Sequence, residues 1–291
     1  MISINTNYGG IFAAKASSQS QLQIDQAMER LSTGKRINHA RDDAAGQAIA
    51  TRLSAEIEGL AMASRNVADG QSLVDTAEGA LVETHALLLR MREIGVQAAN
   101  GTLSSSDNAA LDAEFQQLVA EIDRISDNTS WAGTSLLNGD ATGATNTSAT
   151  FTFQAGVNNA SADRITIEVK NADSATLGVY ADADNDGDTD NDVNLLSMTS
   201  AQAAITVVDN AIAGVSAERG KLGAVSNRMS STMANLDQIT VNLTASKGRI
   251  EDSDFAAETG NLAKGQILQQ AATAMLAQAN ASKQQVLTLI R

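Results

Sequence analysis

The sequence predicts a mainly α-helical protein whose long helices pack along one another. Three observations predict it: an apolar stripe through residues 201–250, the absence of proline, and an apolar fraction poor in aromatic residues. The stripe recurs by steps of four and three residues and includes Ile205, Val208, Val215, Leu222, Met229 and Leu236. Such a stripe needs other long helices, from this chain or from copies of it, laid along it. At 1.5 Å per residue the helix would be roughly 75 Å long.

Composition supports the same fold class. Proline interrupts helical hydrogen bonding, and none occurs among the 291 residues. Hydrophobic residues make up 43% and aromatic residues only 3% of the chain. Much of the apolar fraction is alanine, which favours close helix packing over a bulky core.

The N-terminal residues 1–44 form a weakly amphipathic segment rich in Ala, Ser and Gln. Its apolar clusters are Tyr8, Ile11 and Phe12, then Ile24, Met28 and Leu31. Such a helix is marginal in water by itself. Gly34 ends the pattern, and Asp42 and Asp43 stand where a new helix would begin, which favours its dipole.

Two further stripes are the natural partners of 201–250. The first covers 49–67, resumes after Gly70 and reaches Met91, and Asn100 with Gly101 closes it. The second covers 111–125 with the same spacing.

Short alternating segments at 151–153 and 164–169 predict a small β-hairpin within 151–170. An acidic loop follows at 181–192. Its alternating carboxylates resemble the first half of a calcium loop, but Val193 stands where a bidentate Glu would complete the site. The candidate calcium ligands are Asp182, Asp184, Asp186, Asp188 and Asp190. A solvated acidic loop without a cofactor is the alternative.

The carboxylates of 251–254 interrupt the long stripe and can cap the next helix. The last segment, 254–291, is again Ala- and Gln-rich and weakly amphipathic. Because both chain ends have the same character, we expect them to pair with one another.

Charge and motifs exclude several functions. The net charge of −14 disfavours nucleic acid and anionic membranes as partners. Cysteine is absent, and the two histidines, His39 and His85, lie far apart in the sequence. Phosphate loops, zinc-ligand spacings and nucleophile elbows are also absent, so an enzyme is not expected. The N-terminus lacks a secretory signal, and no segment is apolar enough to span a membrane.

Three stretches then resemble a known family, the bacterial flagellins. They are LSTGKRINHARDDAAGQAIATRL at 31–53, RNVADGQSLVDTAEGALVE at 65–83, and RIEDSDFAAE with AKGQILQQAATAMLAQAN within 249–280. The resemblance implies a D0 domain in which 1–44 and 254–291 pair as a coiled coil. It also implies a D1 helical bundle at 45–253 that carries the hairpin. Larger outer domains are expected to be absent or reduced.

The resemblance implies a structural subunit of the flagellar filament, exported through the flagellar channel to the cell exterior for swimming motility. Implied partners are copies of itself, the export apparatus and its chaperone, the filament cap and the hook-filament junction proteins. The vertebrate toll-like receptor for flagellin is a further implied partner, with Arg90, Ile94 and Glu114 as its contacts. The residues expected in subunit assembly are Ile11, Leu22, Met28, Leu31, Leu262, Leu268, Met275, Val286 and Ile290.

Three alternatives stay open at this point. A hook-filament junction protein shares the terminal helices. A calcium-dependent surface adhesin would use the Asp loop as its active element and the helices as a stalk. An intracellular coiled-coil scaffold would not explain two similar weak ends.

Overall fold

The computed structural model describes residues 6–138, 148–180 and 193–290, without the side chains of 283–290. The chain divides into two compact units, residues 1–58 with 240–291 and residues 59–239. Both divisions fall inside continuous helices, α2 (Ala44–Ala98) and α5 (Met198–Glu251). The domain boundaries predicted from the sequence, near 44 and 254, lie instead at breaks between helices.

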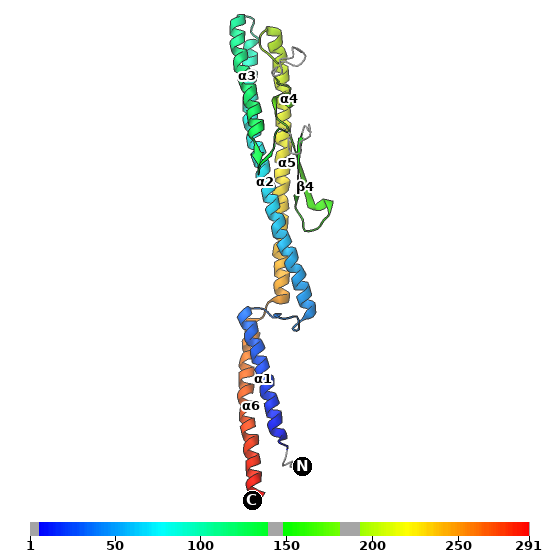
Figure 1. The fold of residues 1–291 in the computed structure, drawn as a ribbon, viewed down its shortest axis with the longest axis vertical. Helices are drawn as coiled ribbons and strands as arrows, with labels where there is room; N and C mark the ends of the chain where they lie inside the picture. Colours follow the sequence, from blue (N-terminus) through cyan, green and yellow to red (C-terminus); the bar gives the residue numbers. More distant parts are fainter. Residues whose placement is uncertain (1–5, 139–147, 181–192, 291) are drawn as a thin grey trace. The chain divides into compact units, whose positions relative to one another are not determined.

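In the unit of residues 59–239, α2 and α5 run together with α3 (Ser105–Asn128), as Figure 1 shows. The predicted stripe of α5 is buried at Val208, Val215, Leu222, Met229 and Leu236. The matching stripe of α2 is buried at the same heptad interval, at Leu60, Val67, Val74, Leu81 and Leu88. Heptad burial on both helices is the pattern of coiled-coil packing.

α2 continues without a break through Gly70, where the sequence predicted an interruption. A helical glycine costs only about 1 kcal/mol relative to alanine. Its Cα also faces side chains that leave no room for a Cβ, since an added Cβ would lie 2.6 Å from Met229 Cε and 3.2 Å from the Phe153 ring. The glycine therefore serves packing within a continuous helix.

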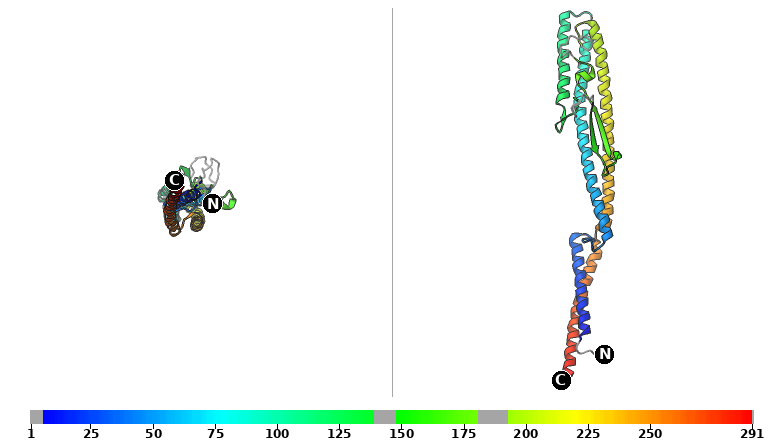
Figure 2. Two further views of the ribbon diagram at one scale, coloured as in Figure 1. Left: turned by 90° about the horizontal axis from the view of Figure 1, so that it is seen from below. Right: turned by 45° about the vertical axis from the view of Figure 1, so that its right-hand side comes forward.

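The predicted hairpin is present as β3 (Ser148–Gln154) and β4 (Arg164–Lys170), paired antiparallel with Phe151 opposite Ile167. Its buried residues are Ala149 of β3 and Ile165, Ile167 and Val169 on alternate positions of β4. Asn66 of α2 donates its side-chain amide to the Gln154 carbonyl over 3.1 Å, so the hairpin lies along the helices (Figure 2).

Short elements complete this unit. A tight turn joins β1 (Ser130–Trp131) to β2 (Thr134–Ser135), with positive φ at Ala132 and Gly133. The 3-10 helix η1 (Ser161–Asp163) precedes β4, and α4 (Ser174–Leu177) follows it. None of the helices that the structure describes combines the length and apolar character needed to cross a membrane.

The other unit contains α1 (Tyr8–Thr33) and α6 (Phe255–Ile290), which lie side by side in Figures 1 and 2. Gly34 ends α1 in the left-handed conformation, with φ of 72°, as its position in the sequence predicted. The predicted acidic starts are also present: Asp43 accepts from the Gly46 amide, and Asp254 accepts from the Ala256 amide, both over 2.8 Å.

Candidate assembly surface

Small residues form the seam between α1 and α6. Ala13, Ala27 and Ala272 are buried there. Gly265 faces Ile24 so closely that an added Cβ would lie 2.8 Å from Ile24 Cγ1. The seam therefore lets the helices approach closely but buries little apolar area, and burial of area is the main source of stability.

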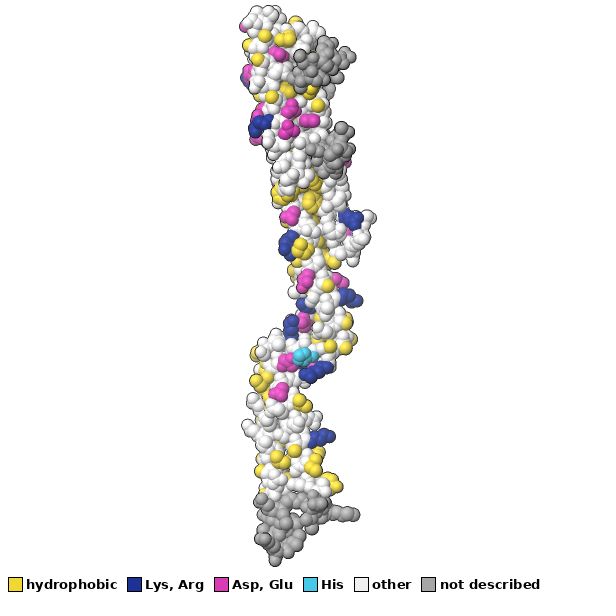
Figure 3. Space-filling view, in the orientation of Figure 1, with side chains coloured by type: hydrophobic (Ala, Val, Ile, Leu, Met, Phe, Trp, Pro, Cys, Tyr) yellow, Lys and Arg dark blue, Asp and Glu magenta, His cyan; other side chains and the backbone are white. Residues whose placement is uncertain are grey.

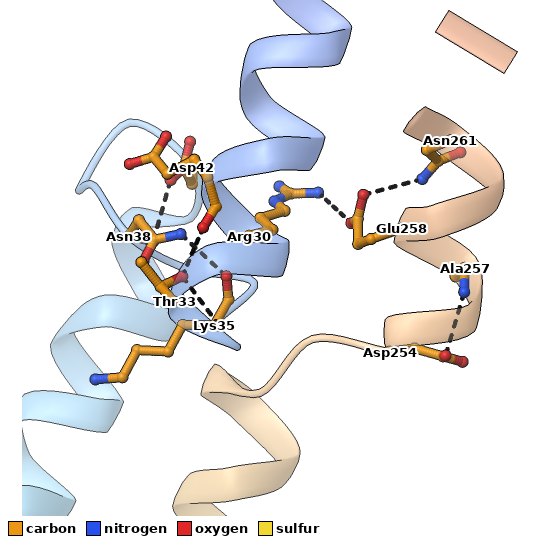
Figure 4. Close-up of polar contacts among 10 residues, drawn as sticks. Arg30, Thr33, Lys35, Asn38, Asp42, Asp254, Ala257, Glu258 and Asn261 are labelled. Carbon is orange, nitrogen blue, oxygen red and sulfur yellow. Dashed lines mark hydrogen bonds and ion pairs between the residues drawn. The ribbon is translucent and has the colours of Figure 1, made fainter. Parts of the chain in front are cut away.

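Polar contacts fix the register of the two helices. Asn7 pairs with Asn280 over 3.2 Å, and Gln21 pairs with Gln269 over 2.6 Å. Near the other end, Arg30 Nη1 lies 2.9 Å from Glu258 Oε1, and Asn261 also donates to this carboxylate (Figure 4). Glu258 is buried, so this ion pair is the best shielded of these contacts.

The segments that enter and leave the α1 and α6 pair are joined by backbone hydrogen bonds. The Arg36 amide donates to the Glu251 carbonyl over 2.7 Å, and the Ser253 amide donates to the Gly34 carbonyl over 2.9 Å. Lys35 Nζ lies 2.6 Å from Glu251 Oε1. A hydrogen bond from Lys35, aided by the charge of Lys247, lowers the pKa of Glu251.

The same connection holds an ordered turn before α2. Asp42 accepts hydrogen bonds from the His39 and Asn38 amides, at 2.9 and 3.2 Å, and these lower its pKa (Figure 4). His39 Nε2 lies 2.9 Å from Glu29 Oε1, so the side chain of His39 makes a structural contact with α1. Hydrogen bonds and ion pairs thus order the chain between α1 and α2.

Most large apolar side chains of α1 and α6 are exposed, whereas Ile24 is buried in the seam with the small residues. Exposed fractions are 60% for Ile11, 67% for Leu22, 56% for Met28, 42% for Leu268 and 65% for Met275. Tyr8, Phe12, Phe255 and Ile267 are exposed as well. Figure 3 shows such hydrophobic side chains on the visible face of the helix pair.

Some of these side chains border a groove, which we call the α1/α6 groove, of about 470 Å³. Its lining residues include Phe12, Ala13, Ala16, Leu268, Ala272 and Met275. Contiguous exposed apolar surface of this kind marks an interaction site.

Of the nine residues that the sequence assigned to assembly, five are thus exposed. Leu31 and Leu262 are half-buried in the helix pair. The side chains of Val286 and Ile290 lie outside the described part of the chain. The sequence did not distinguish residues that hold the pair together from residues left over for other chains, because both recur with helical spacing.

The three residues assigned to receptor contact do not form one exposed surface. Arg90 Nη2 lies 2.8 Å from Glu114 Oε1, and both side chains are about half exposed. Ile94, by contrast, is only 1% exposed and belongs to the core. Its position, three residues after Met91, continues the buried face of α2, so only Arg90 and Glu114 of the three candidates are exposed.

Glu218 is a buried carboxylate that the sequence analysis missed. It accepts from the Lys170 amide, at the end of β4, and from Lys221 Nζ, each over 3.2 Å. Position 218 lies three residues after Val215 and four before Leu222. This spacing places Glu218 on the buried face of α5 and could have predicted its burial. Glu218 anchors the end of the hairpin to α5.

The candidate calcium ligands Asp182 to Asp190 lie outside the described residues, so the calcium site remains a prediction. Across the described ranges, no three His, Asp or Glu side chains are grouped as metal ligands.

Two family models match the chain. Residues 4–142 match the bacterial flagellin N-terminal helical region, and residues 205–290 match the bacterial flagellin C-terminal helical region. The flagellin of Halalkalibacterium halodurans is 44% identical, with 92% of each chain covered. The flagellin of Bacillus subtilis is 42% identical, with 99% of each chain covered. The chain belongs to the bacterial flagellin family.

As a family member, the chain is a structural subunit that self-assembles into the extracellular flagellar filament used for motility. The predicted family, fold class and filament function are confirmed. A flagellar filament core protein of Treponema phagedenis, 38% identical over 99% of each chain, supports the same role. A protein described as hook-associated, from Vibrio parahaemolyticus, shares the fold with a TM-score of 0.57 at 15% identity, covering 72% of this chain and 100% of that one. The junction-protein alternative is therefore not favoured, because only the fold supports it.

Proposed function

We propose that the exposed apolar side chains of α1 and α6 drive addition of each flagellin subunit to the filament. The observation that supports this is that the seam of the helix pair contains mainly small residues, apart from Ile24, whereas most large apolar side chains are exposed. Burying one large apolar side chain contributes about 1.5–3 kcal/mol. Ile11, Leu22, Met28, Leu268 and Met275 together are thus a stronger driving force than the Ala and Gly seam between the two helices.

The same division makes the helix pair weak in an isolated subunit. Ordering each residue costs about 1–2 kcal/mol of backbone entropy, which a seam of small side chains offsets poorly. Contacts with neighbouring copies supply the missing burial. Repetition of a non-closing contact between unlike surfaces produces a helical polymer.

Export as an unfolded chain through the flagellar channel, aided by an export chaperone, suits this arrangement. The chain has no disulfide to prevent unfolding and no proline to slow refolding. Ends that order only on assembly are also available to the filament cap and to the junction proteins. The subunit acts as a passive element of the propeller and catalyses no reaction.

Recognition by the toll-like receptor for flagellin is a further proposed interaction, carried by the family resemblance and by exposure of the Arg90 and Glu114 pair. The monomer should signal, and Arg90→Ala should reduce signalling in a reporter-cell assay. Full signalling by Arg90→Ala would show that this pair does not contact the receptor.

The experiment that tests the assembly proposal compares Leu268→Asp with Leu268→Met. Leu268 is 42% exposed, so neither variant should lower the melting temperature of the monomer. The aspartate should abolish filament growth because its charge cannot be buried without a partner, whereas the methionine keeps the apolar volume. Electron microscopy and sedimentation measure the result. Normal filaments from Leu268→Asp would contradict the proposal.

A further inference from the structure

The thioether of Met275 is exposed and lies in the apolar groove between α1 and α6. Its side chain is 65% exposed, and it lines the groove together with Phe12 and Leu268. Leu268 precedes Met275 by seven residues, so both side chains lie on one face of α6. An exposed thioether in an apolar site has both the access needed for oxidation and a function that oxidation would damage.

We infer that Met275 is an oxidation site that controls whether a free subunit can polymerise, an inference that rests on the proposed role of the α1/α6 groove in assembly. The oxidant class is a peroxide. Its terminal oxygen is transferred to the Met275 sulfur, an S–O bond forms as the O–O bond breaks, and the sulfur loses two electrons. The peroxide is reduced to water or an alcohol, and nothing leaves the protein.

The product, methionine sulfoxide, is polar, whereas the thioether is apolar. A second copy that covers the groove would have to desolvate the sulfoxide oxygen without a matching donor. Loss of one apolar anchor raises the critical concentration for polymerisation by roughly tenfold or more. Within the filament the same sulfur is covered, so assembled subunits are protected.

Other methionines of the chain supply internal standards. Met91 and Met229 are both 0% exposed in the core of residues 59–239, and they should stay reduced as long as the fold is intact. Met62 and Met198 are 47% and 49% exposed, and they should be oxidised in the monomer without an effect on growth. Met28, 56% exposed on α1, belongs to the proposed assembly surface as well, so the test replaces it with leucine to isolate the effect of Met275.

The test treats monomeric full-length protein with hydrogen peroxide, removes the peroxide, maps sulfoxides by peptide mass spectrometry and then measures growth on filament seeds. Each protein is compared with its own untreated sample. Met28→Leu should lose growth after treatment, whereas the double variant Met28→Leu with Met275→Leu should keep the growth of its untreated sample. Peroxide applied to finished wild-type filaments should leave Met275 reduced.

Unchanged growth of oxidised Met28→Leu, or loss of growth by the treated double variant, would overturn the assignment. The proposed assembly function would survive either result, since it fails only if untreated Leu268→Asp forms filaments.

Discussion

Arg30 of α1 and Glu258 of α6 form an ion pair of 2.9 Å although 228 residues separate them in the sequence. Their side chains are 21% and 10% exposed, so water screens the pair only in part. The contact joins the two chain ends directly. It therefore cannot form within either helix alone.

Removing one partner of this pair should cost more than removing both. Glu258→Ala leaves a partly desolvated guanidinium, and we expect a loss of about 1–3 kcal/mol, less than for a fully buried pair. The double variant Arg30→Met with Glu258→Met leaves no buried charge and should lose less. The temperature of filament dissociation reports both. A loss from the double variant equal to the sum of the losses from Arg30→Met and Glu258→Met alone would show that the two side chains do not interact.

Two glycines of α2 should respond oppositely to alanine. At Gly70 the new methyl would meet the Met229 side chain and the Phe153 ring, so Gly70→Ala should destabilise the subunit by about 1–3 kcal/mol. At Gly79 nothing lies within 4 Å, so Gly79→Ala should stabilise it by about 0.5–1 kcal/mol. Urea unfolding of the two monomers measures both effects. A shift of the same sign for both variants would contradict the packing described at Gly70.

Acid should weaken the connection between Lys35 and Glu251. The pKa of Glu251 is lowered in the folded chain, so its contribution is complete above the ordinary glutamate pKa of about 4.3 and is lost as pH falls through the lowered value. Lys35→Gln removes the main cause of the shift and should flatten this part of the stability profile. Thermal unfolding of both proteins from neutral pH to about pH 3 is the measurement. Identical profiles would show that Lys35 does not stabilise the ionised form of Glu251.

The heptad burial of α5 followed from the spacing of its apolar residues, and the hairpin followed from alternation at 164–169. The spacing could not show which apolar residues of the chain ends meet each other. Ile24 faces Gly265 whereas Leu22 faces solvent, and both are large residues on a weakly patterned helix. Because the helix is only weakly amphipathic, several rotations about its axis are nearly equal in free energy. Tertiary contacts decide which rotation is adopted.

The sequence also did not predict the burial of Ile94 and Glu218, for a related reason. Ile94 and Arg90 are four residues apart on α2, yet only the first is in the core, because α3 and α5 cover one side of the helix. Glu218 is polar, and the apolar stripe predicted for 201–250 did not include it. Its burial depends on Lys170, 48 residues earlier, whose position no local pattern encodes.

The Asp182 to Asp190 run remains a sequence-based prediction of weak calcium binding, with a dissociation constant of about 10⁻⁴ to 10⁻³ M because the closing Glu is missing. Titration calorimetry of the full-length monomer should show calcium-dependent heat that Asp186→Ala diminishes. Thr206→Ala, an exposed change on α5, is the control and should leave the heat unchanged. The absence of heat in the wild type would refute the site.

The central claim is that the α1 and α6 pair is weak in the free subunit and is completed by neighbouring copies. Hydrogen exchange followed by mass spectrometry tests it most directly, because peptides from 8–33, 255–282 and 59–128 are read separately in one experiment. In the monomer the two terminal regions should exchange rapidly while 59–128 is protected, and in the filament all three should be protected. Terminal peptides as protected in the monomer as in the filament would contradict the claim.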